Sequence, residues 1–469
     1  MLTAAVDTVL GVTQGELLAG SRDKIVSDVC VDSRCITAGC LFVAMSGERV
    51  DGHDFAVAAI DGGARALLVT RTAEALGDLL DRAASRGVAV VRVADATSAL
   101  QALATYHRAR LHCEVLGITG STGKTTTKDF LTAALSAGKV VVATQGNRNN
   151  EVGVPLTVLG AGASTEVLVV EMGMRGLGQI AHLCEIAQPT MGLLTNIGTS
   201  HIELLGSQDA VARAKGELVA CLGPRGVAFL NGDDEYSARI ATTTAAPVVL
   251  YGLSAACAVR AEDIVLDEES HASFTLVADG VRSAVKLGVP GRHNVYNALG
   301  ACAVALRLGI PAESLGSSLA GAGISAMRMQ VFNSADGVTI VNDAYNANPA
   351  SMRAAVETLA SMQADGKRIA VLGDMAELGS LTELAHFQMG EQVARFGIDT
   401  LVTAGPRAQR IAEGAKADGM SSANISSFDA ADEAGDAVAA LAQPGDIVLV
   451  KASRVMGLET IVDRLMGAR

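Results

Sequence analysis

The stretch Gly120-Ser-Thr-Gly123-Lys124-Thr125-Thr126-Thr127-Lys128 follows the apolar run Cys113–Ile118 and precedes a helical pattern. A strand, a glycine turn and Gly-Lys-Thr in this order predict a phosphate-binding loop, although the strict pattern has Gly where this chain has Ile118. Glycines let backbone N–H groups curl around phosphate oxygens, and the helix N-terminus adds a positive dipole end. We expect these residues to bind nucleotide: Gly120, Ser121, Thr122, Gly123, Lys124, Thr125 and Thr126.

Short apolar runs alternate with helical patterns on both sides of this loop, which predicts an α/β fold. At about 150 residues per domain, 469 residues predict three domains. We expect a small α/β domain over 1–105, a central P-loop domain with a doubly wound parallel sheet over 106–324, and a Rossmann-like α/β domain over 325–469. Residues 272–287 alternate as antiparallel strands do.

Composition narrows the class of protein. Hydrophobic residues make up 49% and charged residues 19%, as in a globular chain, and the net charge of -13 argues against general binding to nucleic acid or a membrane surface. The 8 Cys show no C-x-x-C spacing, so free thiols are expected rather than a zinc site. Residues 1–20 lack a basic segment, and the longest uncharged run contains Pro and Gly. We therefore expect a cytoplasmic protein without a membrane span.

Further polar residues follow apolar runs in the central region. Glu171 ends the run Val167–Val170, where a carboxylate would hold the Mg²⁺ of a nucleotide. His201 follows the run Met191–Thr195, and Lys215 comes soon after it. Taken singly, His201 and Lys215 are also compatible with ordinary surface positions.

Read together, these segments resemble the Mur ligase family in order and spacing over essentially the whole chain. The central segments are Gly120–Lys128, Gly146–Gly153, Glu171–Gly173, Asn196–His201 and Ala214–Glu217. Gly291–Ala298 resembles the family's adenine-side motif, and Met327–Gln330 and Asp343–Pro349 resemble the start of its third domain. Lys451-Ala-Ser-Arg454 departs at Ala452 from the Lys-Gly-Ser-Arg run of the family.

The resemblance implies an ATP-dependent ligase that activates a peptide carboxylate as an acyl phosphate, with catalytic roles for Lys124, Glu171, His201 and Lys215. It also implies Mg²⁺, two ions, held by Thr125, Glu171, His201 and Lys215. Asn294 and Asn297 would lie on the adenine side, with His293 either there or merely packed. Arg328 would reach the γ-phosphate and Asp343 the ribose.

The N-terminal segments Asp32–Arg34, Cys40–Gly47 and Asp51–Phe55 resemble the two later ligases of the family, which hold the UDP end of their substrate in this domain. Three segments are similar to the branch that joins D-alanyl-D-alanine to a UDP-N-acetylmuramoyl tripeptide, namely Asn147–Asn150, Asp343–Pro349 and Gly373–Gly379. The substrate-binding residues implied are Ser33, Arg34, Ser46, Asp51, His53, Asn147, Asn149, Asn150, Asn346 and Asn348. Several of these are also plain turn formers.

The resemblance places the family's carbamylated lysine at Lys215. Hard cations prefer oxygen ligands, which an ammonium group cannot supply. A buried, neutral amine can react with CO₂ to give an anionic carbamate. The alternative is that Lys215 pairs with a phosphate or with Glu171.

Two other functions are compatible with a phosphate loop, namely a P-loop kinase and a nucleotide-controlled switch. The sequence contains no guanine-reading Asn-Lys-x-Asp motif, which disfavours a GTP switch. We expect a monomer. The third residue of the tripeptide, diaminopimelate or lysine, remains open at this point.

Overall fold

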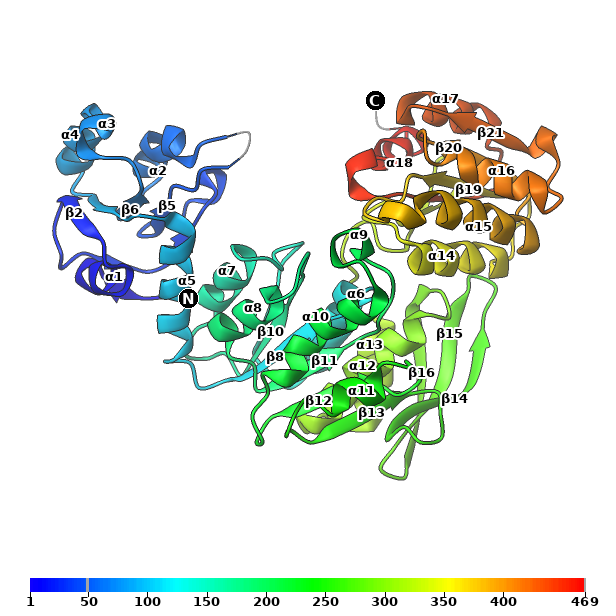
Figure 1. The fold of residues 1–469 in the computed structure, drawn as a ribbon, viewed down its shortest axis with the longest axis horizontal. Helices are drawn as coiled ribbons and strands as arrows, with labels where there is room; N and C mark the ends of the chain where they lie inside the picture. Colours follow the sequence, from blue (N-terminus) through cyan, green and yellow to red (C-terminus); the bar gives the residue numbers. More distant parts are fainter. Residues whose placement is uncertain (48–49, 468–469) are drawn as a thin grey trace.

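The computed structural model describes residues 1–47 and 50–467, and it contains three α/β bodies built on separate sheets (Figure 1). The central body, drawn mainly in green, lies between the other two, and the N- and C-terminal bodies rise from its two ends. Mostly parallel sheets that alternate with helices confirm the predicted α/β class. Within 1–47 and 50–467, no helix combines the length and apolar character needed to cross a bilayer.

The N-terminal body contains a five-stranded sheet that is parallel except for its edge strand β2. Its strands, in spatial order, are β2 (Glu16–Ala19), β7 (Ala89–Arg92), β6 (Ala66–Val69), β5 (Leu41–Val43) and β4 (Val29–Cys30). The strands β1 (Ala4–Ala5) and β3 (Ile25–Val26) form a separate antiparallel pair. The helices are α1 (Val6–Thr13), α2 (Ala56–Asp61), α3 (Ala73–Leu76), α4 (Asp78–Ser85) and α5 (Ala96–Arg108), with 3-10 turns η1 (Ser33–Cys35) and η2 (Gly52–Phe55).

The central body contains a nine-stranded sheet whose first seven strands along the chain are parallel. The spatial order is β16 (Val281–Pro290), β15 (His271–Ala278), β14 (Val259–Leu266), β13 (Val248–Gly252), β12 (Val227–Asn231), β11 (Met191–Leu194), β8 (Glu114–Thr119), β10 (Val167–Glu171) and β9 (Val141–Ala143). The strand β15 is antiparallel to its neighbours β14 and β16, as predicted for 272–287. Its helices are α6 (Lys124–Ser136), α7 (Gly153–Gly160), α8 (Gln179–Ala187), α9 (Ile202–Leu205), α10 (Gln208–Ala220), α11 (Ser237–Ala241), α12 (Asn294–Arg307) and α13 (Ala312–Ala320).

The C-terminal body contains a six-stranded sheet, parallel except for its edge strand β17. The spatial order is β17 (Gln330–Asn333), β18 (Thr339–Asn342), β22 (Ile447–Lys451), β19 (Arg368–Gly373), β20 (Thr400–Ala404) and β21 (Ile425–Phe428). Its helices are α14 (Pro349–Ser361), α15 (Thr382–Arg395), α16 (Gln409–Ala417), α17 (Ala431–Leu441) and α18 (Glu459–Leu465), with turns η3 (Gly379–Leu381), η4 (Ser422–Asn424) and η5 (Arg454–Met456).

Strand β8 is central because its sequence is apolar on both faces. All its residues after Glu114 are buried, as in a parallel strand covered by helices on both sides. Its neighbours β10 and β11 are also fully buried. The order of these three strands creates a topological switch point, since the chain leaves β8 toward β9 and β10 on one side and returns to β11 on the other. Parallel sheets bind ligands at such points.

Helix α5 attaches the N-terminal body to the central one through a buried arginine and a buried histidine. The Arg108 guanidinium donates to the carbonyl oxygens of Ala187 at 2.8 Å and Gln188 at 3.2 Å, which lie at the end of α8. His107 Nε2 lies 2.8 Å from the carbonyl oxygen of Ala161, at the end of α7. These contacts satisfy helix carbonyls that have no partner within their own helices.

Candidate active site

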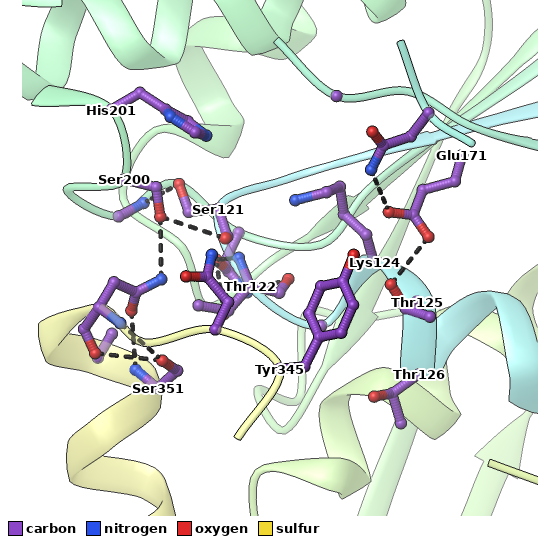
Figure 2. Close-up of a pocket in the computed structure, with 18 of the residues that line it drawn as sticks. Ser121, Thr122, Lys124, Thr125, Thr126, Glu171, Ser200, His201, Tyr345 and Ser351 are labelled. Atoms are coloured by element: carbon purple, nitrogen blue, oxygen red, sulfur yellow. Dashed lines mark hydrogen bonds between the residues drawn. The ribbon is translucent and has the colours of Figure 1, made fainter. Parts of the chain in front are cut away.

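A cavity of about 1300 Å³ opens where the carboxyl ends of β8, β10 and β11 face the C-terminal body. It brings together predicted residues from loops far apart in the sequence (Figure 2). The predicted residues that line it are Ser121, Thr122, Gly123, Lys124, Thr125, Thr126, Asn147, Asn149, Asn150, Glu171, His201, Lys215, Asn294, Asn297, Arg328, Asp343, Asn346 and Asn348.

The N-terminus of α6 is left open toward this cavity. Its N-cap is Gly123, which has a φ of 78° and provides no side-chain cap, so the first N–H groups of the helix have no side-chain partner there. A Cβ at Gly123 would lie 2.1 Å from Asn297 Oδ1, which leaves room only for glycine. Asn297 therefore packs behind the loop, and the free N–H groups can receive an anion.

Two lysines converge on the same carbonyl oxygen of this loop. Lys124 Nζ donates to the Gly120 oxygen at 2.8 Å, and Lys215 Nζ donates to it at 3.0 Å. Burial, reinforced by the charge of Lys124, holds the pKa of Lys215 well below its usual value. Burial also lowers the pKa of Lys124, with the attraction of Glu171 acting in the opposite direction. Among the described residues, the two amines therefore share a carbonyl oxygen and not a carboxylate, so neither forms an ion pair in this loop.

Two oxygens suited to Mg²⁺ lie beside these lysines. Thr125 Oγ1 donates to Glu171 Oε2 at 2.9 Å, and Asn149 Nδ2 donates to Glu171 Oε1 at 2.8 Å. Figure 2 shows Thr125 and Glu171 on the same side of the cavity as Lys124. In the described residues, no group of three or more His, Cys, Asp or Glu side chains is arranged around a common metal position. Mg²⁺ commonly needs only one or two carboxylates, because phosphates and water complete its shell.

Two residues outside the predicted set support the loops. Asn196, directly after β11, accepts from the Thr122 backbone N–H at 3.1 Å and so holds the phosphate loop. Glu217 accepts from the N–H groups of Gly178 at 2.6 Å and Ala181 at 3.0 Å, which caps α8. Both lie in segments that resemble the family. The position of Asn196 soon after a buried strand is the sequence feature that could have identified it as a site residue.

His201 lies at the edge of the cavity that faces the C-terminal body. Its Nδ1 is 2.5 Å from Glu377 Oε2, so it does not approach Glu171 or Lys215 within ion-pair or hydrogen-bond distance in the described structure. The hydrogen bond from His201 lowers the pKa of Glu377.

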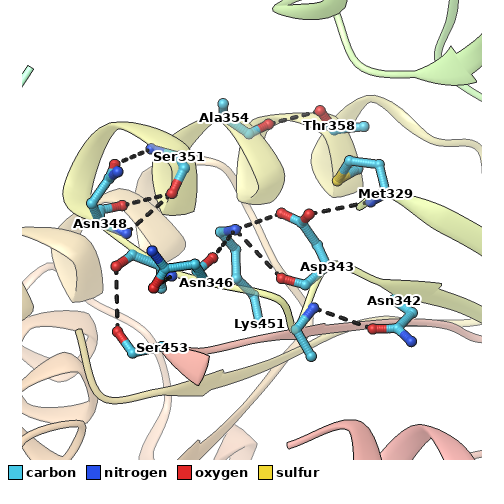
Figure 3. A network of polar contacts seen from close by, with 12 residues as sticks. Met329, Asn342, Asp343, Asn346, Asn348, Ser351, Ala354, Thr358, Lys451 and Ser453 are labelled. Carbon is cyan, nitrogen blue, oxygen red and sulfur yellow. Dashed lines mark hydrogen bonds and ion pairs between the residues drawn. The ribbon is translucent and has the colours of Figure 1, made fainter. Parts of the chain in front are cut away.

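A polar network closes the C-terminal side (Figure 3). Lys451 Nζ is 2.5 Å from Asp343 Oδ2 and donates to the Asn346 carbonyl oxygen at 2.9 Å. Asp343 Oδ1 also accepts from the Met329 N–H at 3.2 Å. The Arg328 guanidinium stacks on the Tyr345 ring, with 4.2 Å from its carbon to the centroid. Arg328 and Asp343 are thus held at the mouth between the two bodies.

The asparagines have mixed environments. Asn348 Oδ1 accepts from the Ser351 N–H at 2.9 Å and caps α14, so the turn role is present alongside any binding role. Asn150 likewise accepts from the Gly153 N–H at 2.9 Å, at the start of α7. Asn294 is 1% exposed and shares a hydrogen bond of 2.8 Å with Asn297. Asn147 and Asn346 are exposed to the cavity.

The predicted UDP-side residues lie in the N-terminal body and do not line this cavity. Asp51 contacts two of the others, because its carboxylate accepts from Ser46 Oγ at 3.2 Å and lies 2.6 Å from His53 Nδ1. Ser33 and Arg34 lie on η1, and hydrogen bonds from Arg34 lower the pKa of Asp32 to about 2. Gly120 also does not line the cavity, although its carbonyl oxygen receives both lysines.

Comparison with known families covers all three bodies. Residues 118–305 match the Mur ligase middle domain, residues 327–454 the glutamate ligase domain of Mur ligases, and residues 26–108 the Mur ligase family catalytic domain. A protein of Bacillus subtilis named UDP-N-acetylmuramoyl-tripeptide–D-alanyl-D-alanine ligase is 35% identical over 99% of both chains. The chain belongs to the Mur ligase family.

Other relatives agree with this membership of the Mur ligases. The protein of the same name from Mycobacterium tuberculosis is 39% identical over 95% of this chain and 93% of its own. MurF from Acinetobacter baumannii superposes with a TM-score of 0.85 at 31% identity, over 100% of this chain and 99% of that chain. A MurF ligase from Thermotoga maritima, solved in complex with ADP, has a TM-score of 0.79 at 28% identity, with 94% and 98% covered.

Proposed function

We propose that this Mur ligase joins D-alanyl-D-alanine to the tripeptide carboxylate of UDP-N-acetylmuramoyl tripeptide, with cleavage of ATP to ADP and phosphate. The observation that carries the proposal is the cavity in which an open phosphate loop with Lys124 and Lys215 faces the strand ends of a second α/β sheet. The full-length relatives carry the name of this reaction. A kinase requires no second acceptor domain of this kind, so the kinase and switch functions are less well supported.

The residues present fit ATP with Mg²⁺. The uncapped N-terminus of α6 and the lysines suit phosphate oxygens. Thr125 and Glu171 offer hard oxygen ligands within 2.9 Å of each other. The proposal assigns Asn294, Asn297 and His293 to the adenine side, and Arg328 and Asp343 to the γ-phosphate and ribose. Burial lowers the pKa of His293 to about 4, so this ring would meet a base in its neutral form.

ATP supplies the phosphoryl group that turns the unreactive carboxylate into an acyl phosphate. Lys124 and the α6 N-terminus offset the repulsion as the carboxylate oxygen attacks the γ-phosphorus and ADP leaves. The amine of D-alanyl-D-alanine then attacks the acyl carbon, and phosphate departs as the amide forms. Asn346 and Asn348, at the C-terminal side of the cavity, would orient the dipeptide. Closed bodies would keep water from the acyl phosphate.

The proposal includes carbamylation of Lys215. No carboxylate lies within ion-pair distance of this lysine in the described residues, and it is 2% exposed. Its lowered pKa favours the neutral amine that reacts with CO₂. The carbamate would place two oxygens and a negative charge in the cavity that Glu171 also lines, which suits a second Mg²⁺ ion. His201 is proposed as a further ligand or as a group that orients the substrate.

The N-terminal body is proposed to hold the UDP end through Ser33, Arg34, Ser46, Asp51 and His53. The tripeptide would then extend past Asn147, Asn149 and Asn150 toward the phosphate loop. Hydrogen bonds from Arg34, and to a smaller extent the charge of Arg148 in that central loop, lower the pKa of Asp32, which lies beside Ser33. Domain limits of 1–105, 106–324 and 325–469 remain part of the proposal.

We also propose that the enzyme acts as a monomer in the cytoplasm. All residues assigned to the reaction come from one chain, and no second copy is needed to complete the cavity. A cytoplasmic location would give the enzyme access to ATP and to a nucleotide-linked precursor.

A substrate-dependence assay tests the function. Phosphate release should require both UDP-muramoyl tripeptide and D-alanyl-D-alanine, and it should equal the amide formed. A stable phosphorylated product would indicate a kinase, and slow hydrolysis without either substrate would indicate a switch. Parallel assays with diaminopimelate and lysine tripeptides would identify the third residue.

A further inference from the structure

A contact between the central and C-terminal bodies joins two residues with unusual backbone conformations. His201 precedes α9, and Glu377 precedes η3. His201 Nδ1 and Glu377 Oε2 are 2.5 Å apart, and each residue has a φ of 61°. Residues with a Cβ rarely adopt this left-handed region, and they do so mainly where surrounding contacts hold them.

Two further contacts hold the same segments together. Asn348 Nδ2, on the C-terminal body, donates to Ser200 Oγ at 3.0 Å. A Cβ placed on Gly379 would lie 3.1 Å from Glu203 Cβ, so the backbone segments around these two residues are in close contact. Gly379 also has a φ of 54°. The segment 200–203 is therefore held by the C-terminal body on both sides of His201.

The contact with Glu377 sets which ring nitrogen of His201 faces a carboxylate. Apart from this contact with Glu377, His201 Nδ1 is buried and has no hydrogen-bond partner among the described residues. A carboxylate on one ring nitrogen keeps the proton there and leaves the other nitrogen as an acceptor. His201 lines the cavity, so the acceptor nitrogen is available to groups bound in it.

We propose that Glu377 is a positioning residue that orients the His201 ring, so that the reactive cavity is complete only when the C-terminal body is docked on segment 200–203. This inference rests on the proposed ligase function. It links the body that would hold the dipeptide to a ring beside the phosphate loop. Formation of the acyl phosphate would thus be favoured when the attacking amine is already near.

The central experiment compares Glu377→Ala with Glu377→Gln. The amide oxygen of Gln can still accept from Nδ1–H, whereas Ala cannot. Glu377→Ala should lower kcat by about 10- to 100-fold, the usual effect of losing such an outer partner. The KM values for ATP and UDP-tripeptide should stay within about twofold, and Glu377→Gln should recover much of kcat. Glu433→Ala, an exposed glutamate on α17, is the matched control.

Gly379→Ala tests the docking of the C-terminal body separately from the charge of Glu377. It keeps both His201 and Glu377 but places a Cβ against Glu203, so it should lower kcat as Glu377→Ala does. A readout independent of turnover is the imidazole ¹⁵N spectrum of labelled protein, in which His201 is assigned by loss of its signal in His201→Asn. The wild-type ring should show one tautomer with Nδ1 protonated, and Glu377→Ala should show a tautomer mixture.

The inference is overturned if Glu377→Ala keeps kcat within twofold, or if its His201 signal is unchanged. It is also overturned if Ala and Gln lose kcat equally while the thermal midpoint falls, since Glu377 would then act only on stability. A wild-type protein without activity dependent on both substrates would instead contradict the proposed function itself.

Discussion

Lys215 on α10 and Lys451 at the end of β22 are equally buried, at 2% exposure, but their surroundings differ. Lys451 lies 2.5 Å from the Asp343 carboxylate, so its charge is balanced within the protein. Among the described residues, Lys215 donates only to the Gly120 carbonyl oxygen, and it has Lys124 nearby. Burying a charge without a counter-charge is unfavourable.

This difference separates the roles of the two sides of the cavity. The C-terminal side is neutral around Lys451, which suits a structural role and a zwitterionic dipeptide. The central side keeps unbalanced positive charge, which suits a triphosphate, a carbamate and metal ions. Bound ligands or a modification would therefore supply the negative charge that the central side lacks. The C-terminal side needs neither, because Lys451 already has Asp343 as its partner.

The largest expected effect is on Lys124. Lys124→Ala should lower ATP turnover by at least about 10²- to 10³-fold, because a charge next to the transferring phosphoryl group is lost. Steady-state phosphate release measures this, with Lys416→Ala on the exposed face of α16 as control. Turnover within tenfold of wild type in a folded variant would contradict the phosphate-loop assignment.

Replacing Lys215 tests whether its missing counter-charge is functional. Lys215→Ala should be nearly inactive and should regain part of its turnover with acetate, whose carboxylate can occupy the vacant ligand position. Lys451→Ala should gain nothing from acetate, since Lys451 has its own carboxylate partner. Full activity of Lys215→Ala, or an acetate effect shared by both variants, would rule out a carbamate role.

The comparison also predicts that replacing the two lysines changes the free energy of unfolding to different extents. Lys451→Met leaves the Asp343 carboxylate without its partner and should lower the free energy of unfolding by about 3–5 kcal/mol. Lys215→Met removes an amine that has no carboxylate partner among the described residues, so it leaves no unpaired carboxylate behind and should cause no such loss. Urea unfolding of both variants measures the difference. Adding Asp343→Asn to Lys451→Met should restore part of the stability, and a failure to do so would argue against charge balance as the cause.

A smaller effect is expected in the N-terminal body, where Arg34 is exposed and already paired with Asp32. Replacing Ser33, Arg34 and Ser46 together by Ala should raise the KM for the UDP substrate by at least about tenfold, since each lost hydrogen bond contributes about 1 kcal/mol. The KM for ATP should change little. Equal increases in both constants would count against a separate uridine site.

The smallest effect concerns pH. The pKa of His293 is lowered to about 4 by burial, against an unfolded value of about 6.5. Between these values the unfolded chain binds the proton and the folded chain does not, so this group lowers stability as pH falls from about 6.5 to 4. The urea midpoint of His293→Gln should therefore fall less than that of wild type between pH 7 and pH 5. Parallel curves would contradict a lowered pKa of His293 in the folded chain.

The sequence predicts those elements whose signal is local. Apolar runs such as Val167–Val170 and Met191–Thr195 match β10 and β11, because a strand buried on both faces is apolar throughout. The edge strands β2, β17 and β21 were not predicted, because their residues are only partly buried and their patterns are weak. The predicted limit after residue 105 falls inside α5, since a continuous helix gives no break in pattern there.

By itself, the sequence determined that a phosphate loop follows a buried strand and that the candidate residues lie at strand ends, because both depend on neighbours along the chain. Only the tertiary structure decided which buried lysine is balanced. Lys451 and Asp343 are separated by 108 residues, and Lys215 and Gly120 by 95. Charge balance depends on distance in space, and packing of the sheets sets that distance.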